Sequence, residues 1–393
     1  MKRIALLLAI LTAGTAPALA APKAVTVKKL TFISTVSAEA MVVSGKTIVT
    51  INNTDGVNSN ILLTGLDING IQLWRKTIDS GVDEVALSSA VDSLGNIWIA
   101  GASSAISAAE SATSAIVVEN SDGVVSEPVT KLRGDMNQLS LWKVSSLGEL
   151  LGTYSLAQSA PPMINAMSVN SNGVSVVGQI QDKPFLVSAS SAGVFGKVIT
   201  IGTLKTQLNA VVRSPDGSTS IFGTSSETLA GKKVAGIRDG ILIKVSKTGA
   251  VASVVRSSAP KANRSWLAAD TTLALTGFVK TGKFIETAFT KFTSAFAPTW
   301  TLRVPSLGQS TVLTAGSTTY GAFTSNSSVP SLATWKPTTP SAVILALDGK
   351  GVITSAYGST ELTETISLGY SKELGLIGLA RTNSQSVSLF KLS

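Results

Sequence analysis

The 393-residue chain contains neither cysteine nor histidine. Without cysteine it has no disulfide and no thiol that could carry a lipid. Without histidine it cannot form a Ser-His-Asp or Cys-His catalytic centre, nor a zinc or iron site with imidazole ligands. Most hydrolases with a recognisable motif are therefore excluded, and an enzyme would need paired carboxylates or a metal bound through oxygen.

Long apolar runs are also lacking after residue 20, since none approaches the roughly 18 apolar residues that span a bilayer. The first twenty residues, MKRIALLLAILTAGTAPALA, have the order of a secretory signal peptide: Lys2 and Arg3, an apolar run, then small residues before Ala21. We expect residues 1–20 to be a signal peptide cleaved after Ala20. Residues 21–393 are then expected to form one exported domain, secreted or otherwise extracytoplasmic, and large enough to be stable without disulfides.

Charge is sparse and scattered. The net charge of +9 falls to +7 once Lys2 and Arg3 leave with the signal peptide, and no run of five like charges occurs. A basic exported protein is attracted to anionic polymers. The scatter nevertheless favours a role in solubility, and we do not expect nucleic acid as a partner.

The chain does contain a repeated hairpin, for which VDSLGNIWIAG, residues 91–101, is the pattern: a turn, then a short apolar strand that ends on glycine. The same order recurs in SNGVSVVG (171–178), PDGSTSIFG (215–223), TTLALTG (271–277), STTYG (317–321) and KELGLIG (372–378), while SGKTIVTI (44–51) keeps only the turn. Alternation with a period of two and glycine turns predict β-strands, and no long helical period competes.

A second type of hairpin lies between these copies. Its six copies span residues 61–74, 139–154, 185–198, 241–255, 288–302 and 343–357. Because the two types alternate, each pair makes a four-stranded antiparallel blade with strands A to D. After the last A–B hairpin only Ser386–Ser393 remains, and Val25–Ser34 has no partner at the start. We therefore predict an all-β, seven-bladed β-propeller whose last blade is closed by the N-terminal strand.

Glycine at the end of strand B is expected where the inner strands of neighbouring blades crowd the axis. VDSLGNIWIAG followed by LSLWKVSSLGEL resembles the bacterial SBBP-like β-propeller repeat, and RDGILIKVSKTGAV, with Lys244, resembles the second half of the same unit. The resemblance implies a propeller fold and frequently an exported protein. It implies no single activity.

The carboxylates mostly stand where hairpins need them. Asp67, Asp92, Asp216 and Asp348 fall in turns, where aspartate bonds to nearby backbone, so we interpret them as structural. The segment NNTDGVNSN, residues 52–60, gathers oxygen ligands but lacks the spacing and the bidentate glutamate of a calcium loop. We expect no metal site and no cofactor, although calcium is the ion that such oxygens would suit. Arg133-Gly134-Asp135 spells an adhesion tripeptide, but three residues recur by chance.

Tryptophans offer possible platforms for sugars. Trp74, Trp98, Trp142 and Trp300 lie at alternating positions of expected strands, which favours packing between blades. Trp335, in the loop SLATWKPTTP beside Lys336, has no such strand, so it is the tryptophan that we expect to be available to a ligand.

The connections between strands B and C vary most in length: 52–60, 102–138 in blade two, 224–239 and 322–341. In a propeller the B–C and D–A connections share one end, and long loops on a rigid scaffold usually carry function. We expect the binding surface there, with the long blade-two insertion at 102–138. The candidate ligand-binding residues are Asn53, Asp55, Glu84, Arg133, Asp135, Lys232, Arg238, Asp239, Trp335 and Lys336.

These features favour a non-enzymatic exported binding or protein-interaction module. Its partner is expected to be a cell-envelope polymer, a glycan or another exported protein. The alternative is a carbohydrate-active enzyme using carboxylates of the same end, such as Glu84, Asp135 and Asp239, which requires two carboxyl groups about 5 to 10 Å apart. A quinoprotein-like dehydrogenase is supported by the strand pattern alone.

Overall fold

The computed structural model describes residues 24–56, 58–105 and 133–392, and within these ranges every regular element is a β-strand. No helix in the described part of the chain is long and apolar enough to cross a membrane. The expected signal peptide and most of the blade-two insertion lie outside the described residues, so those two predictions stay predictions.

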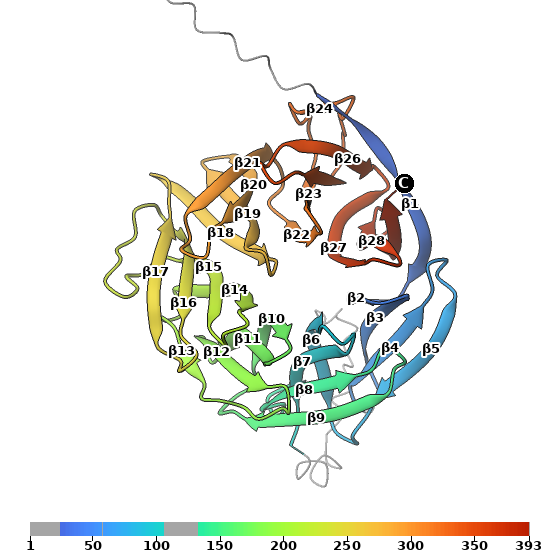
Figure 1. Ribbon diagram of the computed structural model, residues 1–393, viewed down its shortest axis with the longest axis vertical. Coiled ribbons are helices and arrows are strands. Elements are labelled where there is room, and N and C mark those ends of the chain that lie inside the picture. The colour runs from blue at the N-terminus through green and yellow to red at the C-terminus, as the bar shows by residue number, and fades with distance from the viewer. Residues whose placement is uncertain (1–23, 57, 106–132, 393) are drawn as a thin grey trace, which may run out of the picture.

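Four-stranded antiparallel sheets follow one another around a common centre (Figure 1). The first sheet contains β2 (Ala40–Ser44), β3 (Thr47–Thr54), β4 (Asn60–Leu66) and β5 (Gln72–Ile78), and the second contains β6 (Glu84–Val91), β7 (Ile97–Ser103), β8 (Gln138–Val144) and β9 (Leu150–Ala157). The third contains β10 (Met163–Asn170), β11 (Gly173–Ile180), β12 (Lys183–Ser190) and β13 (Ile199–Thr200), and the fourth contains β14 (Thr206–Arg213), β15 (Thr219–Ser225), β16 (Asp239–Val245) and β17 (Val251–Ser257). The fifth contains β18 (Ala262–Ala269), β19 (Ala274–Thr281), β20 (Phe284–Phe292) and β21 (Pro298–Pro305). Each set corresponds to one expected pair of hairpins.

The remaining strands form one larger sheet in which the two ends of the chain meet. Its order is β22 (Ser310–Ala315), β23 (Thr318–Ser325), β25 (Ser341–Leu347), β26 (Ile353–Ser359), β1 (Val25–Val36), β29 (Val387–Leu392), β28 (Gly375–Thr382) and β27 (Leu362–Ser371), and β24 (Leu332–Ala333) pairs with β1. Strand β1 is antiparallel to β29 but parallel to β26 and β24. The sequence pattern does not predict these parallel contacts, through which β1 joins β26 to β29 at the outside of the molecule (Figure 1).

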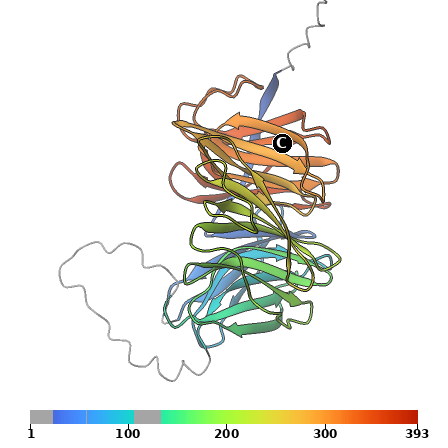
Figure 2. The same cartoon turned by 90° about the vertical axis from the view of Figure 1, so that its left-hand side faces the viewer.

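The strands cross the thickness of the disc, so the hairpin connections lie at its two ends (Figure 2). One end, the loop face, carries the B–C and D–A connections, which bond to each other. In sheet β6–β9 the Gln158 N–H donates to the Asn137 carbonyl at 2.8 Å, and before sheet β14–β17 the Thr203 N–H donates to Glu227 Oε1 at 2.7 Å. The other end, the turn face, carries the A–B and C–D turns.

The alternating side chains of VDSLGNIWIAG pack into two hydrophobic cores, one on each face of its sheet. Ile97 and Ile99 of β7 pack toward sheet β2–β5, whereas Trp98 and Ala100 pack toward sheet β10–β13. All four side chains are buried. The core is therefore a series of layers between successive sheets, and the alternating residues of one strand contribute to the layers on its two faces.

The turn before this strand explains the aspartate of the motif. Asp92 Oδ1 accepts the N–H groups of Leu94 and Asn96, both at 2.9 Å, and Asp92 Oδ2 accepts the indole N–H of Trp98 at 3.1 Å. Burial alone would raise the pKa of Asp92, but these hydrogen bonds outweigh it and lower the pKa. Equivalent backbone bonds hold Asp67, Asp216 and Asp348. The structural interpretation of these four aspartates is confirmed.

The reason given for the strand-B glycines is wrong for five of them. At Gly378 the crowding group is the ring of Phe390, from the paired strand β29 of the same sheet, and the other four meet backbone. A Cβ at Gly101, Gly178, Gly223 or Gly277 would stand 1.9–2.0 Å from a carbonyl oxygen of strand A in the same sheet. Each of those A strands has a register shift beside the glycine, such as the one between Leu208 and Ala210. The bulge crowds the glycine from within the sheet. At Gly321, by contrast, the crowding group comes from a neighbouring sheet and is the ring of Phe289.

The bulged residue itself links one sheet to the next. Asn165, the extra residue of β10, donates its amide to the Leu208 carbonyl at 2.7 Å, and Asn209, the extra residue of β14, donates to the Trp266 carbonyl at 2.8 Å. One local irregularity thus requires glycine in its own sheet and provides a polar contact to the following sheet.

Candidate functional site

The ten residues predicted from the sequence belong to several different sheets, so the structure does not gather them into one site. Two local groups do form on the loop face. One lies beside the blade-two insertion and the other supports the β15–β16 loop, residues 226–238.

The first group is centred on Arg133, where the described chain resumes after residue 132. Its guanidinium pairs with the buried carboxylate of Asp83 and, through Nε, with Asp135 at 3.5 Å. Asp83 also accepts the Ser59 N–H at 2.7 Å, and Ser104 Oγ donates to Asp135 at 3.0 Å. These contacts hold residues 133–135 against Asp83 and Ser104. Asp83, which the sequence analysis did not single out, is the buried carboxylate of this group.

Glu84, the next residue, is almost fully buried at the start of β6. Burial raises the pKa of its carboxyl group, and the hydrogen bond from Ser80 Oγ, at 2.5 Å, opposes that rise only in part. The side chain is enclosed by its own sheet connection, so it does not face a substrate from the loop surface.

We expect Glu84→Gln to raise the melting temperature by about 2 °C at pH 7. The folded pKa is raised, so the unfolded chain releases this proton first, and the penalty grows as the pH rises from about 4.3 toward the folded pKa. Glutamine keeps an acceptor for Ser80 and removes the charge. Thermal unfolding of both proteins near pH 4 and at pH 7 checks this. An equal shift at both pH values would contradict the ionisation argument.

Asn53 and Asp55 illustrate how differently neighbouring candidates are placed. Asn53 is buried, and its amide group exchanges hydrogen bonds with both the N–H and the carbonyl of Ala86, at 2.7 and 2.9 Å, and donates to Glu39 at 2.6 Å. It links sheet β2–β5 to β6. Asp55 is exposed in the short loop that follows, so only Asp55 of this pair is open to a ligand.

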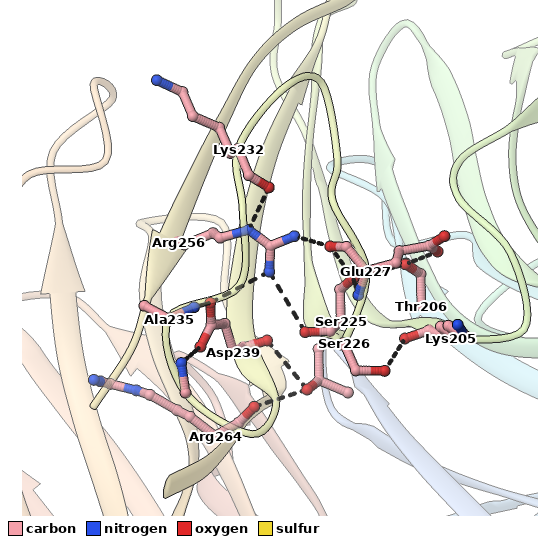
Figure 3. A network of polar contacts seen from close by, with 12 residues as sticks. Lys205, Thr206, Ser225, Ser226, Glu227, Lys232, Ala235, Asp239, Arg256 and Arg264 are labelled. Atoms are coloured by element: carbon pink, nitrogen blue, oxygen red, sulfur yellow. Dashed lines mark hydrogen bonds and ion pairs between the residues drawn. The ribbon is translucent and has the colours of Figure 1, made fainter. Parts of the chain in front are cut away.

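The second group is a polar network beneath the β15–β16 loop (Figure 3). Asp239 is 0% exposed and accepts the N–H groups of Ala235 and Gly236, at 3.0 and 2.9 Å. Arg256 of β17, whose side chain is 7% exposed, lies 3.4 Å from the Asp239 carboxylate. The same guanidinium donates to the carbonyls of Glu227 and Lys232, so one buried cation bonds to both arms of the loop.

Charge balance explains why this network is stable. Burial by itself would raise the pKa of Asp239, but the two backbone N–H groups, Ser258 and Arg256 together lower it. On the other side of the loop base, Glu227 accepts bonds from Thr203 and from Thr206 Oγ1, the latter at 2.6 Å. The carboxylates therefore remain ionised and fully engaged, which fixes the loop from both sides.

The fixed loop exposes basic side chains in its middle and an apolar side chain near its end, where the Ile237 N–H donates to the Ala262 carbonyl. Lys232 and Lys233 are exposed, and Ile237 is 60% exposed. Arg238 is half-buried and its carbonyl accepts the N–H of Arg264 at 2.9 Å. The loop therefore combines a fixed base with exposed side chains.

Trp335 is not an open platform, contrary to the expectation. Its side chain is 8% exposed and belongs to the core of the large sheet. The indole lies on Gly358 of β26, where a Cβ would stand 2.7 Å from the ring. The segment SLATWKPTTP has a weak strand pattern, but β24 within it pairs with β1 and turns the ring inward. Lys336 beside it is exposed.

The four strand tryptophans pack as predicted. Trp98 and Trp142 are fully buried between sheets. On the outer strands, Trp74 covers Gly148 and Trp300 covers Gly351, each a glycine in the C–D turn of the following sheet. Aromatic rings of one sheet therefore lie on the turns of the next.

The three carboxylates named for the carbohydrate-active alternative are divided between two sheets. Glu84 belongs to sheet β6–β9 and Asp239 to sheet β14–β17, with sheet β10–β13 between them. Asp135 is engaged by Arg133 and Ser104. Nor do the described residues contain a group of three or more acidic side chains able to hold a metal ion.

Arg256, Glu227 and Asp83 hold the two groups together, yet the sequence analysis missed all three. Arg256 stands in an ordinary alternating strand and Asp83 in an ordinary connection. Nothing in their neighbouring residues separates them from other surface charges, because their partners come from other segments of the chain.

Comparison with known proteins identifies the architecture. No protein-family model matches the chain, and no curated protein matches its sequence. Among solved structures, the WD40 domain of Toxoplasma gondii coronin is 11% identical, with a TM-score of 0.51 over 94% of this chain and 88% of its own. A putative 6-phosphogluconolactonase from Bacteroides uniformis is 10% identical, with a TM-score of 0.50 over 85% and 88% of the two chains. Such low identities show the fold alone, a β-propeller.

Proposed function

We propose that this protein is an exported, non-enzymatic interaction module that presents the loop face of a seven-bladed β-propeller to a partner. The blade count follows if the large sheet is read as two blades, β22-β23-β25-β26 and β27-β28-β29-β1. Strand β1 then completes the last blade, so the strands at the two ends of the chain pair and close the ring. Export rests on the signal-peptide pattern of residues 1–20.

The observation that carries the proposal is the locked β15–β16 loop of Figure 3. Buried charges at its base fix the backbone, while the loop exposes Lys232, Lys233 and Ile237 to solvent. Ordering a loop before binding removes an entropic cost from association. A loop that exposes two lysines and an isoleucine fits an acidic surface with an apolar patch, such as that of another exported protein.

A site-specific photocrosslinker tests this directly. We expect a crosslinker at Ile237 to capture a defined partner in the exported fraction of the source cells, and Lys232→Glu with Lys233→Glu to reduce the yield severalfold. The matched control is a crosslinker at Val352, which is 53% exposed in a C–D turn of the turn face. Equal capture from both positions, or none from Ile237, would overturn the loop-face assignment.

A separate measurement tests export. Mass spectrometry of the exported protein is expected to find Ala21 at its N-terminus, and retention of residues 1–20 would contradict the signal-peptide prediction.

A further inference from the structure

A cavity lies on the turn face between sheets β10–β13 and β14–β17, away from all ten residues predicted from the sequence. Its volume is about 720 Å³, within the range of small-molecule sites. The lining residues that matter here are Leu186, Ser188 and Lys197 from the first sheet and Arg213, Thr219 and Lys247 from the second.

The cavity exists because the usual aromatic cover is replaced by a smaller side chain. In three other interfaces an outer-strand aromatic ring lies on a C–D turn glycine of the next sheet: Trp74 on Gly148, Tyr154 on Gly193 and Trp300 on Gly351. Here the corresponding contact is made by Ile199, whose Cδ1 would be 2.8 Å from a Cβ at Gly249. Isoleucine fills less space than an indole or a phenol ring, so a hollow remains beside it.

An irregular outer edge widens this hollow. The Gly196 N–H donates to the Ser188 carbonyl at 2.8 Å, and Ile199 pairs with Leu186, but the two intervening residues interrupt the ladder. Lys197 is one of them and lines the cavity. Strand β13 is consequently only two residues long, whereas β17 and β9 have seven and eight. Interrupted strand edges of this kind recur beside functional sites.

The cavity carries positive charge that its own lining does not neutralise. Arg213 is half-buried; its Nη1 donates to Ser175 Oγ at 3.0 Å, and its Nε is enclosed without a hydrogen-bond partner. Among the described residues, Arg213 forms no ion pair with a carboxylate, and no acidic residue lines the cavity. The carboxylate of the adjoining turn, Asp216, is engaged by Ser218 N–H and Oγ, at 2.9 and 2.6 Å.

Burying a cation without a counter-charge is costly, and burial accordingly lowers the pKa of Arg213. Two exposed lysines, Lys197 and Lys247, stand on opposite sides of the same cavity, and Ser188, Thr219 and Ser246 add hydroxyl donors. A guanidinium flanked by lysines and hydroxyls is the donor set that proteins use for phosphate, sulfate and carboxylate.

We propose that this cavity binds an oxyanion borne by a small molecule or by a sugar unit of a polymer, with Arg213 as the inner cation and Lys197 and Lys247 at the entrance. The proposal is independent of the loop face. Charge reversal at Lys232 therefore leaves anion binding unchanged, and loss of the Arg213 site leaves crosslinking from Ile237 unchanged.

Calorimetric titration of residues 21–393 tests the proposal with three probes: inorganic phosphate, a sulfated oligosaccharide and its unsulfated counterpart. We expect the anionic probes to bind with a Kd that rises with salt, and the neutral sugar not to bind. Tighter binding of the sulfated sugar than of phosphate identifies a polymer-borne group, and the reverse order identifies a free anion. Failure of both anionic probes to bind would overturn the proposal.

Variants separate the cavity from general surface charge. Ile199→Trp copies the neighbouring interfaces, so it should fill the hollow, keep the fold and abolish binding. Lys197→Gln and Lys247→Gln should each weaken binding about threefold or more, and Arg213→Gln about tenfold or more. Lys350→Gln, in the C–D turn 348–352 of another sheet, is the matched control and should bind as the parent does. Unchanged binding by Ile199→Trp would overturn the assignment to this cavity.

Discussion

Replacing Gly223 by alanine is expected to lower the free energy of unfolding by roughly 3 kcal/mol, which is large for the addition of one methyl group. The new Cβ would stand 1.9 Å from the Gln207 carbonyl oxygen. That oxygen belongs to backbone paired on both sides of a bulge, so it cannot move without disturbing the register of β14 and β15. Urea denaturation should show a lower midpoint with an unchanged slope.

Gly349→Ala is the control, because no neighbouring atom lies within 4 Å of the place that its new methyl group would take and its backbone does not adopt a positive φ. It should change stability by no more than about 0.5 kcal/mol. If Gly223→Ala unfolds at the parent midpoint, the bulge does not constrain this glycine and the account given for the strand-B glycines fails.

Replacing Asp239 by alanine should cost about 3–5 kcal/mol, because it leaves the buried guanidinium of Arg256 without its carboxylate. It also removes the acceptor for two backbone N–H groups, those of Ala235 and Gly236. Urea denaturation measures the total loss. Hydrogen exchange of the amides in residues 226–238 should show that the loop loses protection first.

Two comparisons sharpen this second prediction. Asp55→Ala, at an exposed aspartate of the same face, should be nearly neutral, and Asp239→Asn should lose less than Asp239→Ala because an acceptor oxygen remains. The pKa of Asp239 is lowered in the fold, so its stabilising effect is present above the unfolded value of about 3.9 and is lost as the pH falls through the folded pKa. A parent protein and an Asp239→Asn variant with the same acid sensitivity would contradict this role.

Much of the fold was predictable because the signals are local. Alternation of apolar residues marks strands, and aspartate four residues before a bonded N–H marks a turn; both arise from contacts within a few residues. VDSLGNIWIAG contains its own turn, its own strand and both buried faces. The sequence therefore predicted correctly that the end of strand B is too crowded for a side chain. It did not predict that the crowding atom at Gly101 is a carbonyl oxygen of the same sheet.

The site was predicted less well because its contacts are not local. Lys232 and Asp55 are exposed as expected, yet Glu84, Asn53, Asp239 and Trp335 are buried and engaged by their own structure. A polar residue after a strand has the same local pattern whether its side chain meets solvent or a buried guanidinium. Arg256 and Arg213 became prominent only when their surroundings were known.

The sequence by itself determined the order of strands, the hairpin turns and the structural role of the turn aspartates, since each depends on residues that are neighbours along the chain. Only the tertiary structure decided where charges are buried, which loop is locked and where a hollow is left between sheets. Those features depend on which side chains from distant segments meet. Ile199 is smaller than the aromatic side chains that make the corresponding contact in three other interfaces, so a cavity remains beside it, and no carboxylate from another described segment reaches Arg213.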